Sequence, residues 1–491
     1  MTDKEKIIII GSGLGGLASG IILAKRGYHV TILEQNWQPG GCMQCFTRHG
    51  AKFETGMHFI GSCEEGQTLH RLLSDLEVLG HDATLPVSLS QLDKNCSDVI
   101  SLAGQRYHFA SGREAWINAL AVDFPDERQN LERLWDVIQE VSAASSMHSL
   151  SNTETDAAVN MEYQLRSINE VVDSIITDPI LKNVVIGNLP LFAAEKDKTP
   201  FSTYAFVMDF YNQSSFRIVG GSDVMVKSMM ATLHKYGAEV VCRKKVTKIE
   251  CSDTRAVACI CADGSRYEAD SFIADIHPQL LLKLCDSSML RAAYRKRVSA
   301  IPNTVGTFSL YLHFNEGCVP YMNYNFFSYA NQSPWNCENY TAESWPEGYL
   351  YMHLCDEENQ QYARSGIVMS YMRYDDVKQW EGTAIGRRGN DYEAFKHKKA
   401  EQLLDAMERD MPGFRKGIKE YFTSTPLTYL DYTGTAEGSM YGIAKDIKLG
   451  PAGRVHHRTK VPNLFITGQN INSHGILGVL VGALVTTNEF Y

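Results

Sequence analysis

The chain has 491 residues, a formal net charge of −10 and a pI of about 5.9, and 44% of its residues are hydrophobic. This length allows two or three domains with substantial cores. Binding to nucleic acid requires a cationic surface, so the acidic balance excludes nucleic acid as an expected partner. The twelve cysteines have no repeating spacing, which argues against a disulfide framework.

The first element is predicted to be a buried strand that leads through a glycine-rich turn into a helix. Residues 7–10 are a continuous isoleucine run, typical of a central parallel strand. Residues 11–16 read Gly-Ser-Gly-Leu-Gly-Gly, and 17–27 have helical periodicity. The uncharged stretch 7–24 is long enough to suggest a membrane span, but its glycines and serines favour strand, turn and helix. With no secretory signal in the sequence, we expect a cytoplasmic protein.

A dinucleotide-binding motif, G-x-G-x-x-G, coincides with this turn, and an acidic residue ends the next strand. Gly11 makes the tight turn, Gly13 allows the backbone to approach a pyrophosphate, and Gly16 allows close packing of the helix on the sheet. Leu14 and Gly15 begin the helix, whose free N–H groups and positive dipole end face the phosphates. The motif therefore predicts a nucleotide site.

The residues after the second strand favour FAD over NAD. The predicted strand 28–33 ends at Glu34, which can accept both ribose hydroxyls of an adenosine and would repel a 2′-phosphate. Gln35 follows, and the pair Gly40-Gly41 offers a second close approach of backbone to phosphate, as FAD-binding folds often do. We therefore expect FAD, held without a covalent bond.

The end of the chain is predicted to return to the same site. A short strand at 463–467 leads to a glycine turn at Gly468 and to a helix expected to open near Gly478. The positive N-terminus of such a helix suits the negative N1–C2=O edge of a reduced flavin.

These segments together resemble the FAD-dependent polyene oxidoreductases, the family that contains phytoene desaturases, carotenoid isomerases and retinol saturases. The similar stretches are 7–41, the F-x-x-x-G-x-x-F-x-T-G-x-H-x-I-G pattern of 46–61, and 463–478, while 220–250 and 425–443 look like the second adenine-ribose unit and the return to the flavin. The resemblance implies an FAD site that adds the following contacts to those above: Cys42, Gly56, Met57, His58, Val246, Gly468, Gln469, Gly478 and Val479.

Within the family, two stretches look closer to the saturase and isomerase branch than to bacterial phytoene desaturases. They are Thr55 to Gly61 and Asn472 to Gly475. Desaturases and amine oxidases commonly carry an acidic residue where this chain has Gln469. The flavin contact there would be an amide hydrogen bond, which fits a saturase or isomerase.

The sequence Cys42-Met-Gln-Cys45 raises the question of a redox pair or a zinc site. Disulfide reductases of this fold place a reactive cysteine pair after the first nucleotide unit, but with four intervening residues and a second dinucleotide motif. A zinc site would need a second pair of ligands, and none is readable. We interpret the pair as two small residues that lie beside the cofactor. Residues 53–61 are interpreted as a half-buried strand that lines a cavity. Cys259-x-Cys261 reads as core, and no metal is expected.

The fold class is predicted to be α/β, with a Rossmann-type, glutathione-reductase-like FAD-binding domain, an antiparallel-sheet substrate domain and a helical insertion. We assign 1–70, 206–290 and 425–491 to the FAD-binding domain, 71–205 to the helical substrate or cap region, and 291–424 to the sheet. Tyr, Phe and Met on four predicted strands between 300 and 375 suit a long, flat polyene. The apolar runs at 178–194 and 203–211 are core, or line a tunnel and touch a membrane surface.

The expected reaction is hydride transfer between flavin N5 and a C=C or CH–CH unit of a hydrophobic retinol- or carotenoid-like molecule, with saturation or isomerisation favoured over desaturation. His58 and His474 are the candidate acids because the resemblance places both beside the flavin, and Tyr432 and Tyr441 are weaker candidates. No site for NAD(P)H is readable, so the electron donor or acceptor stays open. The alternatives are a flavin amine oxidase of the same fold and a non-catalytic prenyl-lipid escort protein.

Overall fold

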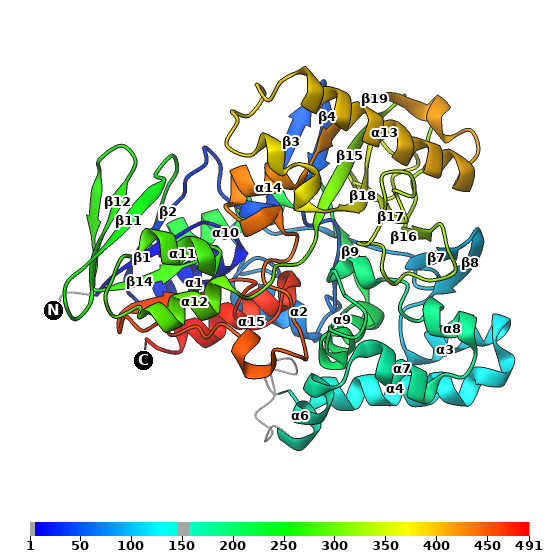
Figure 1. The fold of residues 1–491 in the computed structure, drawn as a ribbon, viewed down its shortest axis with the longest axis horizontal. Helices are drawn as coiled ribbons and strands as arrows, with labels where there is room; N and C mark the ends of the chain where they lie inside the picture. Colours follow the sequence, from blue (N-terminus) through cyan, green and yellow to red (C-terminus); the bar gives the residue numbers. More distant parts are fainter. Residues whose placement is uncertain (1–4, 146–156, 491) are drawn as a thin grey trace.

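The computed structural model describes residues 5–145 and 157–490. Three regions are visible in Figure 1: a lobe at the left that holds both termini, a sheet with a long helix at the upper right, and a group of helices at the lower right. The chain passes between these regions several times, and the functional site lies where they meet.

The left lobe is built on a five-stranded parallel sheet with the order β10-β2-β1-β14-β20. Alternate residues of β1 enter different cores: Ile7 and Ile9 pack with one cluster, Ile8 and Ile10 with the other. Both faces of the sheet are therefore covered, as the all-apolar sequence of β1 predicts. The elements are β1 (Lys6–Ile10), α1 (Leu14–Lys25), β2 (His29–Leu33), α10 (Asp223–Lys235), β10 (Glu239–Val241), β14 (Ser271–Ala274), β20 (Leu464–Ile466) and α15 (Gly475–Thr487).

A small antiparallel sheet and two helices complete this lobe. The sheet order is β11-β12-β13, and the strands lie at the far left in Figure 1. The bounds are β11 (Val246–Cys251), β12 (Ala256–Cys261), β13 (Arg266–Glu268), α11 (Pro278–Leu284) and α12 (Ala292–Ser299). Cys259 and Cys261 on β12 are buried in the core, as predicted.

The upper-right region is a seven-stranded sheet with the order β19-β15-β18-β17-β16-β7-β8. The four aromatic strands expected between residues 300 and 375 are present and pair antiparallel. One pair, β16 with β7, is parallel. The bounds are β7 (Asp98–Leu102), β8 (Gln105–Phe109), β15 (Gly306–Phe314), β16 (Asn325–Tyr329), β17 (Gly348–His353), β18 (Ser365–Met372), α13 (Asn390–Asp410), β19 (Ile418–Ser424) and α14 (Pro426–Thr433).

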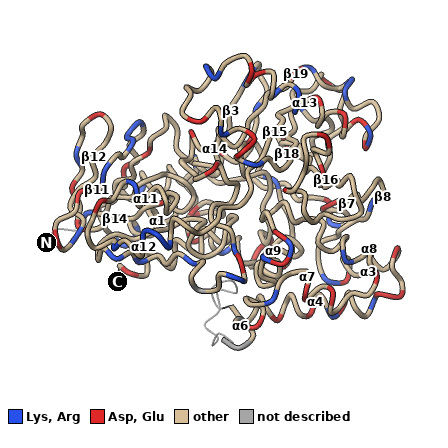
Figure 2. The backbone as a smooth tube through the Cα atoms, viewed as in Figure 1, with Lys and Arg blue, Asp and Glu red and all other residues tan. Residues whose placement is uncertain are grey.

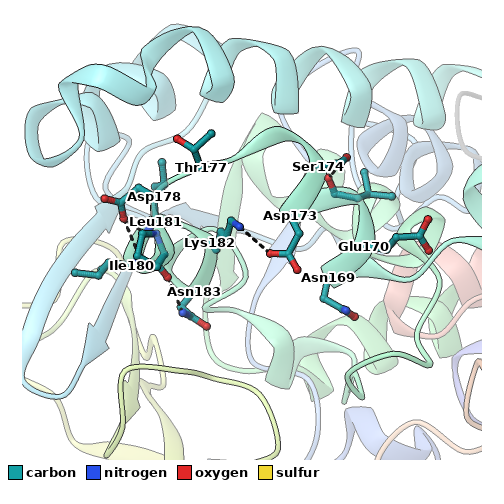
Figure 3. A network of polar contacts seen from close by, with 12 residues as sticks. Asn169, Glu170, Asp173, Ser174, Thr177, Asp178, Ile180, Leu181, Lys182 and Asn183 are labelled. Atoms are coloured by element: carbon teal, nitrogen blue, oxygen red, sulfur yellow. Dashed lines mark hydrogen bonds and ion pairs between the residues drawn. The ribbon is translucent and has the colours of Figure 1, made fainter.

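The lower-right region contains most of the helices of the predicted insertion. Their bounds are α3 (Arg113–Asp123), α4 (Arg128–Ala143), α6 (Ala157–Leu165), α7 (Ile168–Ile175), α8 (Pro179–Val184) and α9 (Phe201–Gln213). The short helix α2 (Thr68–Asp75) lies apart from them and packs in the core of the left lobe. Figure 3 shows the corner between α7 and α8, where the Asp178 side chain accepts hydrogen bonds from the N–H groups of Ile180 and Leu181 at 2.8 and 2.9 Å. This cap starts α8, and the Lys182–Asp173 ion pair at 3.2 Å joins the two helices.

Two differences from the sequence-based picture concern strands. Residues 89–109, expected to belong to a helical region, contain β6 (Leu89–Gln91), β7 and β8, and the last two extend the seven-stranded sheet. The segment 53–61, expected as one strand, is divided between β4 (Ala51–Glu54), which pairs with β3 (Cys45–Arg48), and β5 (Ile60–Gly61), which pairs with β9 (Ser215–Ile218). The bend between β4 and β5 is what turns residues 56–59 toward the cavity.

Charges of both signs are interspersed over the molecule, as Figure 2 shows. Among the described residues, no helix is both long enough and apolar enough to cross a bilayer.

Candidate functional site

A cavity extends from the carboxyl edge of the parallel sheet to the inner face of the seven-stranded sheet. One half is lined by the glycine turn after β1, the end of β2, and the residue after β14. The other half is lined by aromatic, Leu and Met side chains from β16, β17 and β18 and from segments 190–191 and 440–441. Ligands of open α/β sheets bind at this edge, where neighbouring strands lead away in opposite directions.

The glycines of the turn are required by close backbone packing. A Cβ on Gly16 would lie 2.2 Å from the carbonyl oxygen of Gly11, and a Cβ on Gly11 would lie 2.5 Å from the carbonyl oxygen of Asp275. Gly11 also has a φ of +96°, which favours glycine. A Cβ on Gly41 would approach the Cα of Gly13 at 3.1 Å. This geometry fits the tight turn predicted at Gly11 and the close packing predicted at Gly16, and the phosphate contacts of Gly13 and Gly41 stay predictions.

A half-buried carboxyl group that the sequence analysis did not single out lies among these glycines. Asp275 follows β14, and its Oδ2 accepts a hydrogen bond of 2.8 Å from the N–H of Gly16 at the start of α1. Added Cβ atoms on Gly13, Gly15 and Gly468 would all lie within 2.7 Å of its carboxylate oxygens. Burial, followed by the nearby charge of Glu34, raises the pKa of Asp275 to about 7.

Glu34 lies at the end of β2 where the motif predicts an acid, and its carboxylate is held in place by three hydrogen bonds. Oε2 accepts from the N–H and hydroxyl of Ser12 at 3.1 and 2.5 Å, and Oε1 accepts from the N–H of Asn36 at 2.8 Å. The side chain is buried yet lines the cavity. Oε2 uses both of its lone pairs on Ser12, whereas Oε1 keeps one lone pair that a ribose hydroxyl can use.

Most of the predicted cofactor residues line this one cavity. They are Gly11, Gly13, Leu14, Gly15, Glu34, Gln35, Gly40, Gly41, Cys42, Gly56, Met57, His58, Val246, Gly468, Gln469 and Val479. Gly16 and Gly478 do not line it. Gly16 packs on Gly11, and a Cβ on Gly478 would lie 2.5 Å from the carbonyl oxygen of Ser473. The helix expected to open near Gly478 begins earlier, at Gly475, with His474 as its N-cap.

His58 is buried in the cavity wall next to another acidic residue, Glu54. Nδ1 of His58 lies 3.4 Å from Oε2 of Glu54, and both side chains are 6% exposed. Neither ring nitrogen has a hydrogen-bond partner among the described residues. The other oxygen of Glu54 accepts a 2.9 Å hydrogen bond from the N–H of Ser222. An imidazole that lines a cavity, has no hydrogen-bond partner on its ring nitrogens and lies 3.4 Å from a carboxylate can give or accept a proton.

The other predicted acids occupy different places. His474 lies behind the cavity wall, with its ring 4.9 Å from that of Tyr441, which does line the cavity. Burial, followed by the charge of Lys445, lowers the pKa of His474 to about 3, so this ring is neutral near pH 7. Tyr432 is 40% exposed, and its carbonyl oxygen accepts hydrogen bonds from Gln35 and Asn36. Tyr432 therefore lies in the Glu34 half, away from the aromatic lining.

The cysteine pair after the double glycine has no features of a redox centre. Burial raises the pKa of Cys42 to about 11 and that of Cys45 to about 12, so both remain thiols. Cys45 Sγ lies 3.4 Å from the hydroxyl of Ser222, and Cys42 lines the cavity. No cluster of three or more metal-ligating side chains exists in the described part of the chain.

The apolar half of the cavity is formed largely by the aromatic strands. Its lining includes Tyr329, Leu350, Met352, Met369, Tyr371 and Tyr441. Segments 178–194 and 203–211 mostly pack in the core, but Pro190, Leu191 and Tyr211 reach the cavity. Both interpretations of these apolar runs, core and cavity wall, thus apply to different residues of the same segments.

The residues present fit a dinucleotide. The turn is made mostly of glycines, α1 presents its N-terminus there beside the Asp275 carboxyl, and Glu34 keeps acceptor capacity at the end of the second strand. The charged lining is confined to Glu34, Lys244 and Asp275, all in this half of the cavity. The other half is apolar and suits a hydrophobic small molecule.

Comparisons with known proteins agree with this division. A family model described as an NAD(P)-binding Rossmann-like domain matches residues 9–76. The chain is 24% identical to the all-trans-retinol 13,14-reductase of Homo sapiens in an alignment 533 residues long. The alignment covers 99% of this chain and 85% of that protein. It is 20% identical to the chloroplastic prolycopene isomerase 1 of an Oncidium hybrid cultivar, over 99% of this chain and 84% of the relative.

Among solved structures, an oxidoreductase from Methanosarcina mazei has a TM-score of 0.66 at 15% identity, over 98% of this chain and all of that one. The predicted α/β class with a Rossmann-type nucleotide-binding domain is therefore confirmed. The resemblance to the polyene oxidoreductases is confirmed as well, because relatives from both the retinol-reductase and the isomerase branches match along the whole chain.

Proposed function

Given this similarity to all-trans-retinol 13,14-reductases and prolycopene isomerases, we propose that the protein is an FAD-dependent oxidoreductase acting on a C=C or CH–CH unit of a hydrophobic polyene such as a retinoid or carotenoid. Saturation or isomerisation is favoured over desaturation.

The observation that carries the proposal is the continuity of the cavity. A nucleotide-type half with glycines and acids joins an apolar half lined by Tyr, Leu and Met, without a separating wall. FAD bound at the glycine turn supplies a two-electron hydride donor or acceptor. An elongated apolar molecule in the other half would then lie next to it, shielded from water by the buried aromatic side chains.

The protein's own residues have separable roles in this proposal. The N–H groups at the start of α1 bind the pyrophosphate, and Glu34 accepts from the adenosine ribose. Cys42, Gly56, Met57, Val246, Gln469 and Val479 shape the remainder of the cofactor site. His58 delivers or removes the proton at the carbon that does not exchange hydride, because the residue lines the cavity and neither ring nitrogen has a hydrogen-bond partner among the described residues. His474, as a neutral ring behind Tyr441, has a supporting role.

The direct test is anaerobic. The purified, chemically reduced protein is mixed with all-trans-retinol or a linear carotene, and the flavin and polyene absorption bands are followed together. Flavin reoxidation with a shortened chromophore supports a saturase, and a changed polyene isomer with the flavin still reduced supports an isomerase. If neither band moves with any polyene, while the oxidised protein in air oxidises amines with release of hydrogen peroxide, the proposal is wrong.

The role of His58 is tested by His58→Gln, with His81→Gln as the matched control because His81 is 94% exposed and remote from the cavity lining. Loss of a general acid typically slows turnover by about 10²–10⁴-fold. We expect that loss for His58→Gln with flavin content unchanged, and no loss for the control. Normal turnover of a flavin-loaded His58→Gln protein would remove His58 as the acid. Contact with a membrane surface remains part of the proposal and is tested by sedimentation with phospholipid vesicles.

A further inference from the structure

Two cysteines outside the cavity lie close together at the edge of the nucleotide-binding lobe. Cys251 is the last residue of β11, and Cys285 immediately follows α11. Their Sγ atoms are 3.6 Å apart. A disulfide requires about 2.05 Å, so the two sulfurs need to approach by roughly 1.5 Å. Cys251 is partly exposed, whereas Cys285 is fully buried.

The backbone around the pair is well fixed on one side and adjustable on the other. Ile249 of β11 forms an isolated parallel bridge with Cys285, which brings the two segments together. The guanidinium of Arg295 donates to the carbonyl oxygens of Leu282 and Cys285 at 2.7 and 2.6 Å and holds the end of α11. Cys251 lies at a register irregularity of the β11–β12 pair, where a strand end can shift.

The two thiols also differ in acidity. The hydrogen bond from Cys285, with a further one from Ser287, lowers the pKa of Cys251 to about 7. The same contact, together with burial, raises the pKa of the Cys285 thiol. A partly exposed thiolate next to a buried thiol is the arrangement in which one sulfur attacks an oxidant and the other then resolves the product.

We propose that Cys251 and Cys285 are a reversible redox site that forms an intramolecular disulfide when a hydroperoxide reaches Cys251. The Cys251 thiolate attacks one peroxide oxygen, the O–O bond breaks, and Cys251 becomes a sulfenic acid while hydroxide leaves. The Cys285 sulfur then attacks the Cys251 sulfur, forming the S–S bond, and the sulfenic hydroxyl leaves as water with the thiol proton. Two thiols lose two electrons and the peroxide is reduced by two.

This disulfide would join two elements of the nucleotide cavity. Val246, at the start of β11, and Leu280 and Leu284, on α11, all line it. A cross-link between the end of β11 and the residue after α11 closes a loop of about 35 residues, a length for which disulfides stabilise the folded state. We therefore expect oxidation to raise the melting temperature by several degrees and to leave the bound flavin in place.

The experiment uses the purified full-length holoprotein. It is treated with stoichiometric hydrogen peroxide, its free thiols are alkylated, and it is digested without reductant for mass spectrometry. The expected product is a linked Cys251–Cys285 peptide, two hydrogens lighter than the sum of its parts, that disappears after dithiothreitol treatment. Cys285→Ser should instead leave Cys251 as a sulfenic acid that dimedone traps. The buried neighbour Cys259 provides the control: Cys259→Ser should still form the link.

Three results would overturn the proposal: no linked peptide in the wild-type protein, over-oxidation of Cys251 to sulfinic acid without a link, or a link found only in covalent dimers. The wild-type measurement decides the question even where a variant fails to fold. None of these results depends on a polyene substrate, so the outcome is separate from that of the proposed function.

Discussion

Gly16 provides a stringent test of how α1 is packed on the parallel sheet. In the Gly16→Ala variant the new Cβ would lie 2.2 Å from the Gly11 carbonyl oxygen, whereas ordinary contact begins near 3.4 Å. The conflicting atom belongs to the backbone of the turn, so it cannot rotate away. Overpacking of this kind costs about 1–3 kcal/mol. The turn would also be displaced at the point where the pyrophosphate is proposed to bind.

The matched control is Gly482→Ala, in the interior of α15. Its Cβ would meet the side-chain end of Ile471 at 3.3 Å, which can yield. The gain in helix propensity is about 1 kcal/mol at Gly482, an interior position, and smaller at Gly16 in the first turn of α1, so the lower stability expected for Gly16→Ala reports mainly the steric conflict. We expect Gly16→Ala to melt about 1–3 °C below Gly482→Ala, followed by tryptophan fluorescence, and to retain less flavin. Equal melting temperatures and equal flavin content would refute the packing argument.

Two ionisable side chains, Asp275 and Arg217, give further predictions. Because the pKa of Asp275 is raised from 3.8 to about 7, its carboxyl favours folding while protonated and opposes it once charged. The stability of Asp275→Asn relative to wild type should therefore rise between pH 4 and 7 and then level off; a pH-independent difference in melting temperature would contradict this. Arg217 donates 3.0 Å hydrogen bonds to the Tyr324 carbonyl and the Asn325 side chain and compensates the buried Asp98. Arg217→Met should cost about 3–5 kcal/mol, and adding Asp98→Asn should recover part of it; no recovery in chemical denaturation would show that the two charges are independent.

The nucleotide-binding half could be predicted from the sequence because its signals are local. The apolar run of β1, the glycine turn and Glu34 lie within 30 residues, and the spacing alone fixes their arrangement. Asp275 lies some 260 residues from Gly16, and only the pairing of β14 with β1 brings the two together. The sequence did contain a signal for Asp275. This acid directly follows the apolar run 272–274, just as Glu34 directly follows the second strand.

The hairpin of β7 and β8 was missed for a different reason. Its turn, Ala103-Gly104, has positive φ at both positions, as a tight two-residue hairpin requires. A tight turn of this kind joins β7 to β8 but does not specify which other strand β7 pairs with. The parallel pairing with β16, more than 200 residues later, depends on the assembled sheet. Similarly, the closeness of Glu54 and His58 arises from the bend after β4, which periodicity does not specify.

The strand order of the parallel sheet also constrains how the protein can fold during synthesis. β1 pairs with β14, and β14 pairs with β20 at residues 464–466. At about 5–20 residues per second, the ribosome needs roughly 10–40 s to make the stretch between β14 and β20. Throughout that time the apolar edge of β14 lacks its native neighbour. Pairings this distant in sequence close slowly, so the nascent chain is expected to depend on chaperones until its last residues emerge.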